Sequence, residues 1–407
     1  MQEKWHTDRW FVSSWNYDPS VTSDYKFADK ITIHDTTLRD GEQETGVALK
    51  ADAKIRIAEL LAEAGVHRIE AGMPAVSSQD EKAIREIVKR NLGPEIFAFA
   101  RCVVDDVKRA ADCGVDGIIV EIPSSGHLIK YAYNWEVESA VQKSIEATRA
   151  AKELGLKTVF FTIDSSRAEM PWLLELIQRV ATEGHMDSLT LVDTMGVLSP
   201  GGVSYFVKNV QKRFGKIPLE AHFHNDFGLA VANTITALSL GIQTAHTTVL
   251  GIGERAGGAA LEELVMALKL LYGIDVGVRT ERLFELGQTV ARLTGHPIAG
   301  NKPVVGKSLW EVQSGIPASW LRRCRGDRVL EVFPMRWDLV GQSEARIVLG
   351  KGSNDESVRE WLEKLGLNAT PEQISDMVPL VKAKAMDKNG CLTEEEFREI
   401  VKEVTGC

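Results

Sequence analysis

The chain has 407 residues, of which 44% are hydrophobic and 26% charged, a balance typical of a folded protein exposed to water. No segment approaches the roughly 20 consecutive apolar residues that a membrane-spanning helix needs. The net charge of −9 repels nucleic acid and anionic lipid, and the five cysteines form no CxxC pair, which indicates reduced thiols. We therefore predict a cytoplasmic protein that acts on small molecules and binds neither nucleic acid nor a membrane.

Residues 1–28 form a tryptophan-rich segment without the basic and apolar regions of a secretory signal. Trp5, Trp10 and Trp15 recur every five residues, a spacing that fits neither a helix nor a strand. We expect an arm that packs its indole rings on the rest of the chain or on a second subunit.

Residues 29–290 repeat one pattern, in which a short β-branched run is followed by a polar turn and an amphipathic helix. Strands that alternate with helices form a parallel sheet, and eight such units predict a closed (β/α)8 TIM barrel. No GxGxxG follows the first run, which argues against a dinucleotide-binding fold. The predicted strands are Ile31–Thr37, Arg68–Gly72, Ile96–Arg101, Gly117–Pro123, Thr158–Asp164, Ser188–Thr194, Leu219–Asp226 and Ala245–Gly251.

Residues 291–407 lack this rhythm and are predicted to form a mainly helical C-terminal extension. After an irregular stretch rich in Pro, Gly and Trp, the segments SNDESVREWLEKLGL, TPEQISDMVPLVKAKAMD and TEEEFREIVKEV have helical periodicity. Ser353 or Asn354, Thr370 and Thr393 are the expected N-caps of these three helices.

Two polar motifs lie where a TIM barrel carries its functional groups, at the carboxyl ends of the strands. Arg39 and Asp40 follow the first strand, with Gln43 nearby, and His222 and His224 are two residues apart on the seventh strand, so they point the same way. Two imidazoles and one carboxylate suit a divalent ion such as Zn²⁺, Mn²⁺, Co²⁺, Fe²⁺ or Mg²⁺. The alternative is a pair of buried, hydrogen-bonded histidines and an unrelated aspartate.

The motifs HDTTLRDGEQ, HFHNDFGLAVANT and GIGERAGGAALEE resemble the DRE-type TIM-barrel metallolyases, or HMGL-like family, nearest the 2-isopropylmalate, homocitrate and citramalate synthases. VLGKGSN and DKNGCLTEEEF resemble the helical linker subdomains of those synthases. The resemblance implies metal-dependent condensation of an acyl-CoA, expected to be acetyl-CoA, with a 2-oxo acid to give a 2-hydroxy dicarboxylic acid. It also implies a homodimer, and the chain stops before the regulatory leucine-binding domain, so feedback control by that route is not expected.

The resemblance assigns metal binding to Asp40, His222 and His224, with Asn225 supporting the site. Arg39 is expected beside the developing oxyanion, because a guanidinium stays protonated and offers a planar set of donors. His127 is either a general acid or a loop histidine with no catalytic contact. The remaining candidates are Gln43 and Glu70 near the reacting carbons and Thr194, Ser124, Ser125 and Arg167 for substrate binding.

Several of these assignments have a purely structural alternative that the sequence leaves open. Arg39 could pair with Asp35 or Glu42 instead of with a substrate. Glu70 could be an ion-pair partner at the barrel mouth, and Thr194 could cap a helix.

Three positions depart from the synthase pattern. Ile163 stands where the synthases carry a glutamate, Pro317 where a histidine reaches the neighbouring subunit's site, and Gly258 where they carry an asparagine. Neither isoleucine nor proline can transfer a proton, so the enolate-forming machinery is altered. Two alternatives therefore remain, namely a CoA-independent aldolase, lyase or decarboxylase acting on an oxo or hydroxy acid, and a non-catalytic metal- and ligand-binding barrel. The segment after the eighth strand contains no cysteine, which disfavours a close copy of hydroxymethylglutaryl-CoA lyase.

Overall fold

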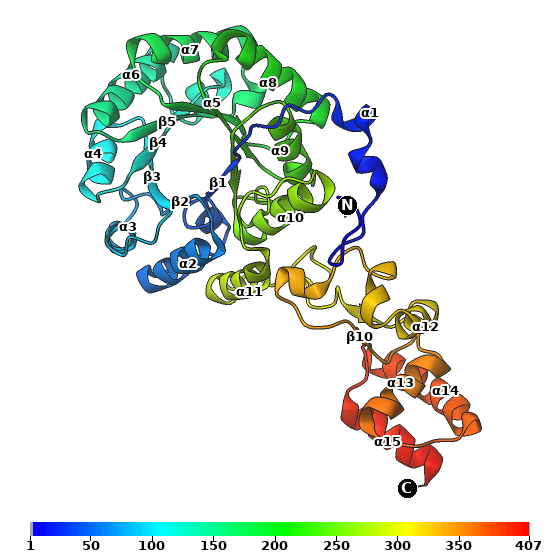
Figure 1. Ribbon diagram of the computed structural model, residues 1–407. Coiled ribbons are helices and arrows are strands. Elements are labelled where there is room, and N and C mark those ends of the chain that lie inside the picture. Colours follow the sequence, from blue (N-terminus) through cyan, green and yellow to red (C-terminus); the bar gives the residue numbers. More distant parts are fainter. Residues whose placement is uncertain (1–2, 407) are drawn as a thin grey trace. The chain divides into compact units, whose positions relative to one another are not determined.

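In the computed structural model, which describes residues 3–406, eight parallel strands close into a barrel in chain order, with β8 paired to β1 (Figure 1). The predicted (β/α)8 barrel is confirmed, and the predicted strand ends differ from the observed ones by only a few residues. The strands are β1 (Thr32–Asp35), β2 (Arg68–Glu70), β3 (Glu95–Arg101), β4 (Gly117–Pro123), β5 (Lys157–Ile163), β6 (Ser188–Asp193), β7 (Leu219–Phe223) and β8 (Thr244–Thr247).

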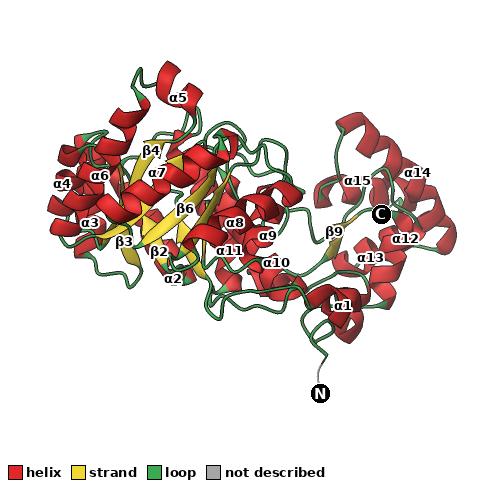
Figure 2. Cartoon of the chain, turned by 90° about the horizontal axis from the view of Figure 1, so that it is seen from above, coloured by secondary structure: helices red, strands yellow, loops and turns green. Residues whose placement is uncertain are grey.

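Helices follow the strands and cover the outside of the barrel (Figure 2). In α2 (Ala51–Ala64), which follows β1, Ile55, Ala58 and Leu61 recur at helical spacing and are buried, and Gly65 ends the helix with a φ of 86°. The short α1 (Pro19–Thr22) precedes the barrel. The other helices of the barrel unit are α3 (Ser78–Lys89), α4 (Val104–Asp112), α5 (Gly126–Tyr131), α6 (Val137–Glu153), α7 (Met170–Glu183), α8 (Pro200–Phe214), α9 (Ala230–Ser239), α10 (Leu261–Leu271) and α11 (Leu283–Thr294).

The interior of the barrel is divided into an apolar half and a polar half. On β3 to β6 the buried cluster contains Phe97, Phe99, Ile119, Val159, Phe161 and Val192. On β7, β8, β1 and β2 the buried side chains include Glu220, His222, His246, His34 and Glu70. Because of this division, one wall of the barrel mouth is apolar and the other carries ionisable groups.

The residues outside the barrel unit form a second compact unit. The barrel unit spans Asp18–Ile298, and the described residues 3–17 belong with residues 299–406. The described residues of this unit contain a small parallel pair of strands and four α-helices. No described helix of the chain is long and apolar enough to cross a bilayer. Its elements are β9 (Glu311–Val312), β10 (Arg346–Ile347), α12 (Gly315–Arg323), α13 (Asp355–Leu365), α14 (Pro371–Lys388) and α15 (Glu394–Thr405).

The last three helices match the sequence prediction and enclose their own core. Asn354, Thr370 and Thr393 each accept a hydrogen bond from a backbone N–H in the first turn of the helix that follows. Trp361 and Phe397 pack together in the core of this bundle, with ring centroids 5.7 Å apart.

The predicted arm over residues 1–28 is divided between the two units. Phe11 N donates to Pro334 O at 2.9 Å, so the first part of the arm pairs with the C-terminal segment, whereas Lys26 N donates to Ser239 O of the barrel at 2.8 Å. Trp15 does not pack on the rest of the chain, since it is 80% exposed, so its packing on a second subunit stays a prediction. Residues 1 and 2 lie outside the described part of the chain.

A tight contact at the start of β4 tests the packing of the apolar half. A Cβ added at Gly117 would lie 2.3 Å from Cε1 of Phe97, whereas one added at Gly126 would meet nothing within 4 Å. We expect Gly117→Ala to lower the free energy of unfolding by about 1–3 kcal/mol in urea denaturation, because an overpacked core forces its neighbours to shift. Gly126→Ala is the control and should be neutral or slightly stabilising. Equal stabilities of the two variants would contradict this packing.

Candidate active site

The turn after β1 carries Arg39 and Asp40 in a fixed position. The backbone N–H groups of Arg39 and Asp40 both donate to Thr36 O, at 3.0 and 2.8 Å. Nζ of the buried Lys54 donates to Leu38 O at 3.2 Å. It also forms an ion pair with Glu42 at 2.5 Å, so the ammonium group of Lys54 on α2 fixes the position of the turn.

Asp40, His222 and His224 converge at the mouth of the barrel. Their ligand atoms lie within 4.8 Å of one another, with 3.3 Å between the two histidine Nε2 atoms and 3.8 Å from His222 Nε2 to Asp40 Oδ2. His224 Nδ1 lies 3.1 Å from the carbonyl of Gly257, which favours the tautomer with a free lone pair on Nε2.

The chemistry of this cluster fits a divalent metal ion. All three side chains are buried, and Asp40 Oδ2 has no hydrogen-bond partner among the described residues. Burial, together with the neighbouring His224, holds the pKa of His222 well below its ordinary value, so its imidazole is neutral. Two neutral nitrogens and a buried carboxylate oxygen without a hydrogen bond form the donor set of a borderline divalent cation.

Arg39 is held by Glu70 and Gln43 rather than by either partner that the sequence suggested. Its Nε donates to Glu70, its Nη1 donates to Gln43 Oε1 at 2.9 Å, and its guanidinium lies 4.1 Å from the ring centroid of Phe99. Burial opposes ionisation of Glu70, but Arg39 and His34 outweigh it and lower the pKa of that carboxyl to about 2. Nη2 of Arg39 is buried with no hydrogen-bond partner in residues 3–406, so one donor remains available to a ligand.

A cavity of about 180 Å³ lies between these groups and the apolar wall of the barrel. Six residues singled out from the sequence as site residues line it. The same cavity also contacts aromatic and aliphatic side chains and two further carboxylates. The lining residues are Arg39, Asp40, Gln43, Met73, Phe99, Glu121, Phe161, Ile163, Val192, Thr194, His222, His224 and Glu254.

Three further predicted site residues gather around Asp164 beside the cavity, namely the candidate general acid His127 and the candidate substrate residues Ser125 and Arg167. Ser125 Oγ, His127 Nε2 and Arg167 Nε lie 2.5, 2.8 and 2.7 Å from the Asp164 carboxylate. Ser124 Oγ donates to the carbonyl of Ile163 at 2.7 Å. These contacts brace the turns after β4 and β5, and none of these residues lines the cavity.

Thr194 and Asn225 have local hydrogen-bond partners near the cluster of Asp40, His222 and His224. Thr194 Oγ1 accepts a hydrogen bond from Asp164 N at 2.8 Å, so it does not cap a helix and its hydroxyl proton is free to donate. Asn225 Oδ1 accepts from Ala230 N at 3.0 Å and its backbone N–H donates to Gly257 O at 2.8 Å, which fixes the chain just after His224.

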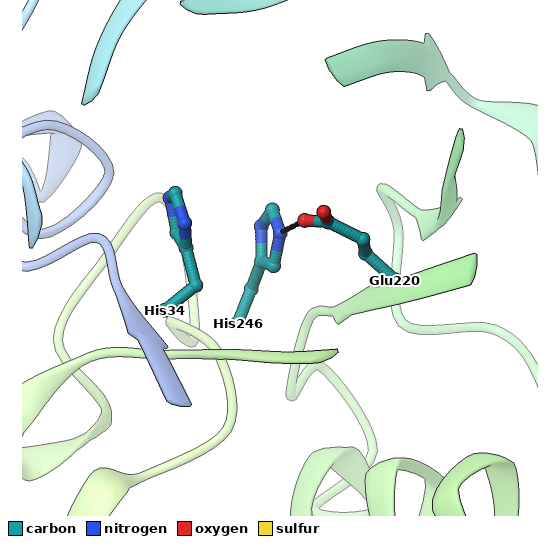
Figure 3. Close-up of side chains that lie close together, drawn as sticks. All are labelled: His34, Glu220 and His246. Carbon is teal, nitrogen blue, oxygen red and sulfur yellow. Dashed lines mark hydrogen bonds and ion pairs between the residues drawn. The ribbon is translucent and has the colours of Figure 1, made fainter. Parts of the chain in front are cut away.

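A second buried group of potential ligands, His34, Glu220 and His246, lies deeper in the barrel (Figure 3). His246 Nε2 lies 2.7 Å from Glu220 Oε2, and His34 Nε2 lies 3.0 Å from Glu70 Oε2. The two imidazoles stack with centroids 4.4 Å apart, so their nitrogens do not aim at one point. Because each Nε2 already faces a carboxylate, we interpret this group as a hydrogen-bonded core network and the Asp40 cluster as the candidate metal site.

Comparison with known proteins places the barrel in a family. Residues 30–290 match the HMGL-like family. The chain belongs to this family. It is 36% identical to homocitrate synthase AksA of Methanothermobacter thermautotrophicus over 98% of this chain and 99% of that protein, and 36% identical to the 2-isopropylmalate synthase of Methanocaldococcus jannaschii over 93% and 72%.

Solved structures agree with this family at the level of the fold. The HMG-CoA lyase of Bacillus subtilis is 22% identical and superposes with a TM-score of 0.63 over 69% of this chain and 99% of that chain. The family match and the two similar synthases confirm the predicted family and its synthase branch.

Sequence reasoning missed Glu121 as a member of the site. It lies on β4 between apolar residues, in the run Gly117–Pro123, and lines the cavity. The signal was available, because an acidic residue inside a β-branched strand of a barrel is costly to bury unless it faces a polar cavity.

Metal titration tests the assignment of the two buried groups. We expect Asp40→Asn to weaken Mn²⁺ or Zn²⁺ binding on the order of 100-fold or more, since loss of even a supporting residue costs 10–100-fold in metal affinity. His246→Gln removes a residue of the deeper group and should change that affinity by less than about threefold. Isothermal titration calorimetry of metal-free protein measures both. If His246→Gln, rather than Asp40→Asn, abolished binding, the ion would belong to the deeper group.

The acid stability of the barrel depends on His34. Burial lowers the pKa of this imidazole to about 4, against an ordinary value of 6.5. Between these values the unfolded chain binds a proton at His34 and the folded chain does not, so the free energy of unfolding falls as the pH is lowered from 6.5 to 4. We expect wild type to lose roughly 3 kcal/mol more than His34→Gln over this interval, measured by urea denaturation of metal-free protein. Parallel pH curves would contradict a neutral buried imidazole.

Proposed function

We propose that the protein is a divalent-metal-dependent acyltransferase that condenses acetyl-CoA with a 2-oxo acid bearing an apolar side chain. The observation that carries the proposal is the cavity in which the Asp40, His222 and His224 cluster and the free Nη2 of Arg39 face an apolar wall. The names of its relatives, homocitrate synthase and 2-isopropylmalate synthase, support this type of reaction.

The overall reaction consumes one water. A C–H bond of the acyl methyl group breaks, its electron pair forms a bond to the keto carbon, and the keto oxygen gains a proton. Water then cleaves the thioester, which gives the 2-hydroxy dicarboxylic acid and free CoA. A divalent cation held by Asp40, His222 and His224 would supply Lewis acidity that polarises the keto group.

The chain's own donors stabilise the two charged parts of the oxo acid. Nη2 of Arg39 would donate to the keto oxygen as it becomes negative, while Glu70 and Gln43 hold the guanidinium in place. The Thr194 hydroxyl would donate to the substrate carboxylate, because its oxygen already accepts from Asp164 N. Preorganised donors of this kind act strongly in a cavity that excludes water.

The walls of the cavity support an apolar side chain on the oxo acid. Met73, Phe99, Phe161, Ile163 and Val192 line it, and Arg39 is the single cation among its described lining residues. Arg39 is already paired with Glu70, so a second carboxylate on the substrate would be buried without a partner charge.

We also propose that four site residues act on the substrate only through Asp164 and the turns they brace, namely Ser124, Ser125, His127 and Arg167.

We further propose that the protein forms a homodimer in the cytoplasm. The helix α12 exposes 84% of Ile316 and 47% of Trp320, and a second subunit would bury this apolar surface. Light scattering measures the mass of the particle, and a monomer would contradict the dimer.

A thiol assay tests the proposed reaction. Purified protein with Mn²⁺, acetyl-CoA and each of pyruvate, 2-oxobutyrate, 2-oxoisovalerate and 2-oxoglutarate should release CoA, detected with a thiol reagent. We expect kcat/KM for the best alkyl oxo acid to exceed that for 2-oxoglutarate at least about tenfold, because burying an unpaired carboxylate costs more than the 1.4 kcal/mol that this ratio represents. A preference for 2-oxoglutarate would contradict the apolar pocket, and turnover of an oxo acid without any CoA ester would favour an aldolase, lyase or decarboxylase.

A further inference from the structure

Glu121 is the carboxylate of the cavity that has no structural task. Three carboxylates line the cavity, those of Asp40, Glu121 and Glu254. Asp40 belongs to the histidine cluster, and the side chain of Glu254 is 52% exposed and lies 3.5 Å from the guanidinium of Arg255. Within residues 3–406, by contrast, no hydrogen bond or ion pair within 4.0 Å engages the carboxylate of Glu121.

The alternation of β4 directs Glu121 into the barrel. Ile119 belongs to the apolar interior cluster, and Glu121 follows two residues later, so it points the same way. In the sheet register Glu121 lies beside Phe161 of β5, and Pro123 lies beside Ile163. Glu121 and Ile163 therefore approach the same cavity from adjacent strands.

The surroundings of Glu121 suit a group that exchanges a proton near neutral pH. Burial raises the pKa of Glu121 to about 7, and the charges of Arg39 and Arg101 only partly oppose this shift. Glu70 and Asp106 also face it, and so does Tyr133, whose phenol pKa is raised to about 12 by burial and by Glu121. A general base works best when its pKa lies close to the working pH.

Resting on the proposed condensation, we propose that Glu121 is the base that removes the proton from the acyl methyl group. The C–H bond breaks, the proton passes to a carboxylate oxygen of Glu121, and the electron pair becomes the enolate that attacks the keto carbon. The protonated Glu121 then returns its proton to the alkoxide or to solvent, which restores the carboxylate. Asp40 and Glu254 are engaged elsewhere, and Ile163 has no group that accepts a proton.

Solvent exchange separates this step from the rest of the reaction. Acetyl-CoA is incubated in D₂O with Mn²⁺ and oxalate, which offers the chelating oxygens of an oxo acid without a ketone, and deuterium in the methyl group is measured by mass spectrometry. We expect Glu121→Gln to slow exchange and kcat by about 10²–10⁴-fold, the usual contribution of a general base. Affinities for Mn²⁺ and for the oxo acid, from calorimetry, should change by less than about threefold.

Two further variants distinguish catalysis from a structural role. Glu121→Gln combined with Ile163→Glu returns a carboxylate to the cavity from the neighbouring strand and should recover at least about tenfold of the lost exchange rate. Glu121→Asp should keep partial activity and move the acid limb of the pH profile of kcat/KM. Glu138→Gln on the exposed face of α6 is the matched control and should behave as wild type.

The outcomes separate the two proposals. If wild type releases CoA and Glu121→Gln does so within about threefold, the assignment of Glu121 is wrong and the condensation stands. An equal loss of oxo acid affinity and of rate, with no recovery in the double variant, would likewise overturn it. If wild type shows neither exchange nor CoA release with any oxo acid, the proposed function fails and the role of Glu121 falls with it.

Discussion

The pairing of β1 with β8 is the constraint on which the candidate site depends. Asp40 follows β1 and His222 lies on β7, about as far apart in the chain as the barrel allows, and they meet because β8 pairs with both neighbouring strands. Closure brings Asp40 Oδ2 to 3.8 Å from His222 Nε2. An open sheet of the same elements would leave β1 and β8 at opposite edges, and neither the cluster of Asp40, His222 and His224 nor the cavity would exist.

Burial of charge in the polar half of the barrel is compensated by pairing. Arg39 is held by Glu70, Glu70 also accepts from His34, and Glu220 pairs with His246 and with Arg68 at 2.8 Å. Glu70 and Glu220 therefore each have at least two donors, which offsets the cost of removing these carboxylates from water. The same pairing leaves one guanidinium nitrogen of Arg39 unsatisfied at the mouth, where a substrate oxygen would complete its hydrogen bonds.

Much of the barrel and part of the site followed from the sequence, because both depend on short-range periodicity. Strand–helix alternation gave the topology, and the two-residue spacing of His222 and His224 gave their common direction. The cluster around Asp164 could not be foreseen, since the directions of Ser125, His127 and Arg167 depend on loop geometry and on a left-handed backbone at Asp164, with φ 62°. The division of residues 1–28 between two units was equally hidden, because it depends on contacts with residues some 300 positions away that no local pattern records.

The three departures from the synthase pattern lie in different places. Ile163 lines the cavity, Gly258 forms a backbone bridge with His224, and Pro317 lies on α12 of the second unit. The groups that would activate the oxo acid, namely Arg39, Thr194 and the Asp40 cluster, come from the ends of β1, β6 and β7 and are all present. Ile163 lies on β5, and the nearest unpaired carboxylate lies on β4, one strand away. Adjacent strands of a barrel present side chains to the same cavity, so a carboxylate moved by one strand still reaches it, while Arg39, Thr194 and the cluster of Asp40, His222 and His224 keep their places. In the proposed condensation, the base could therefore move from β5 to Glu121 on β4 while the groups that activate the oxo acid stay in place.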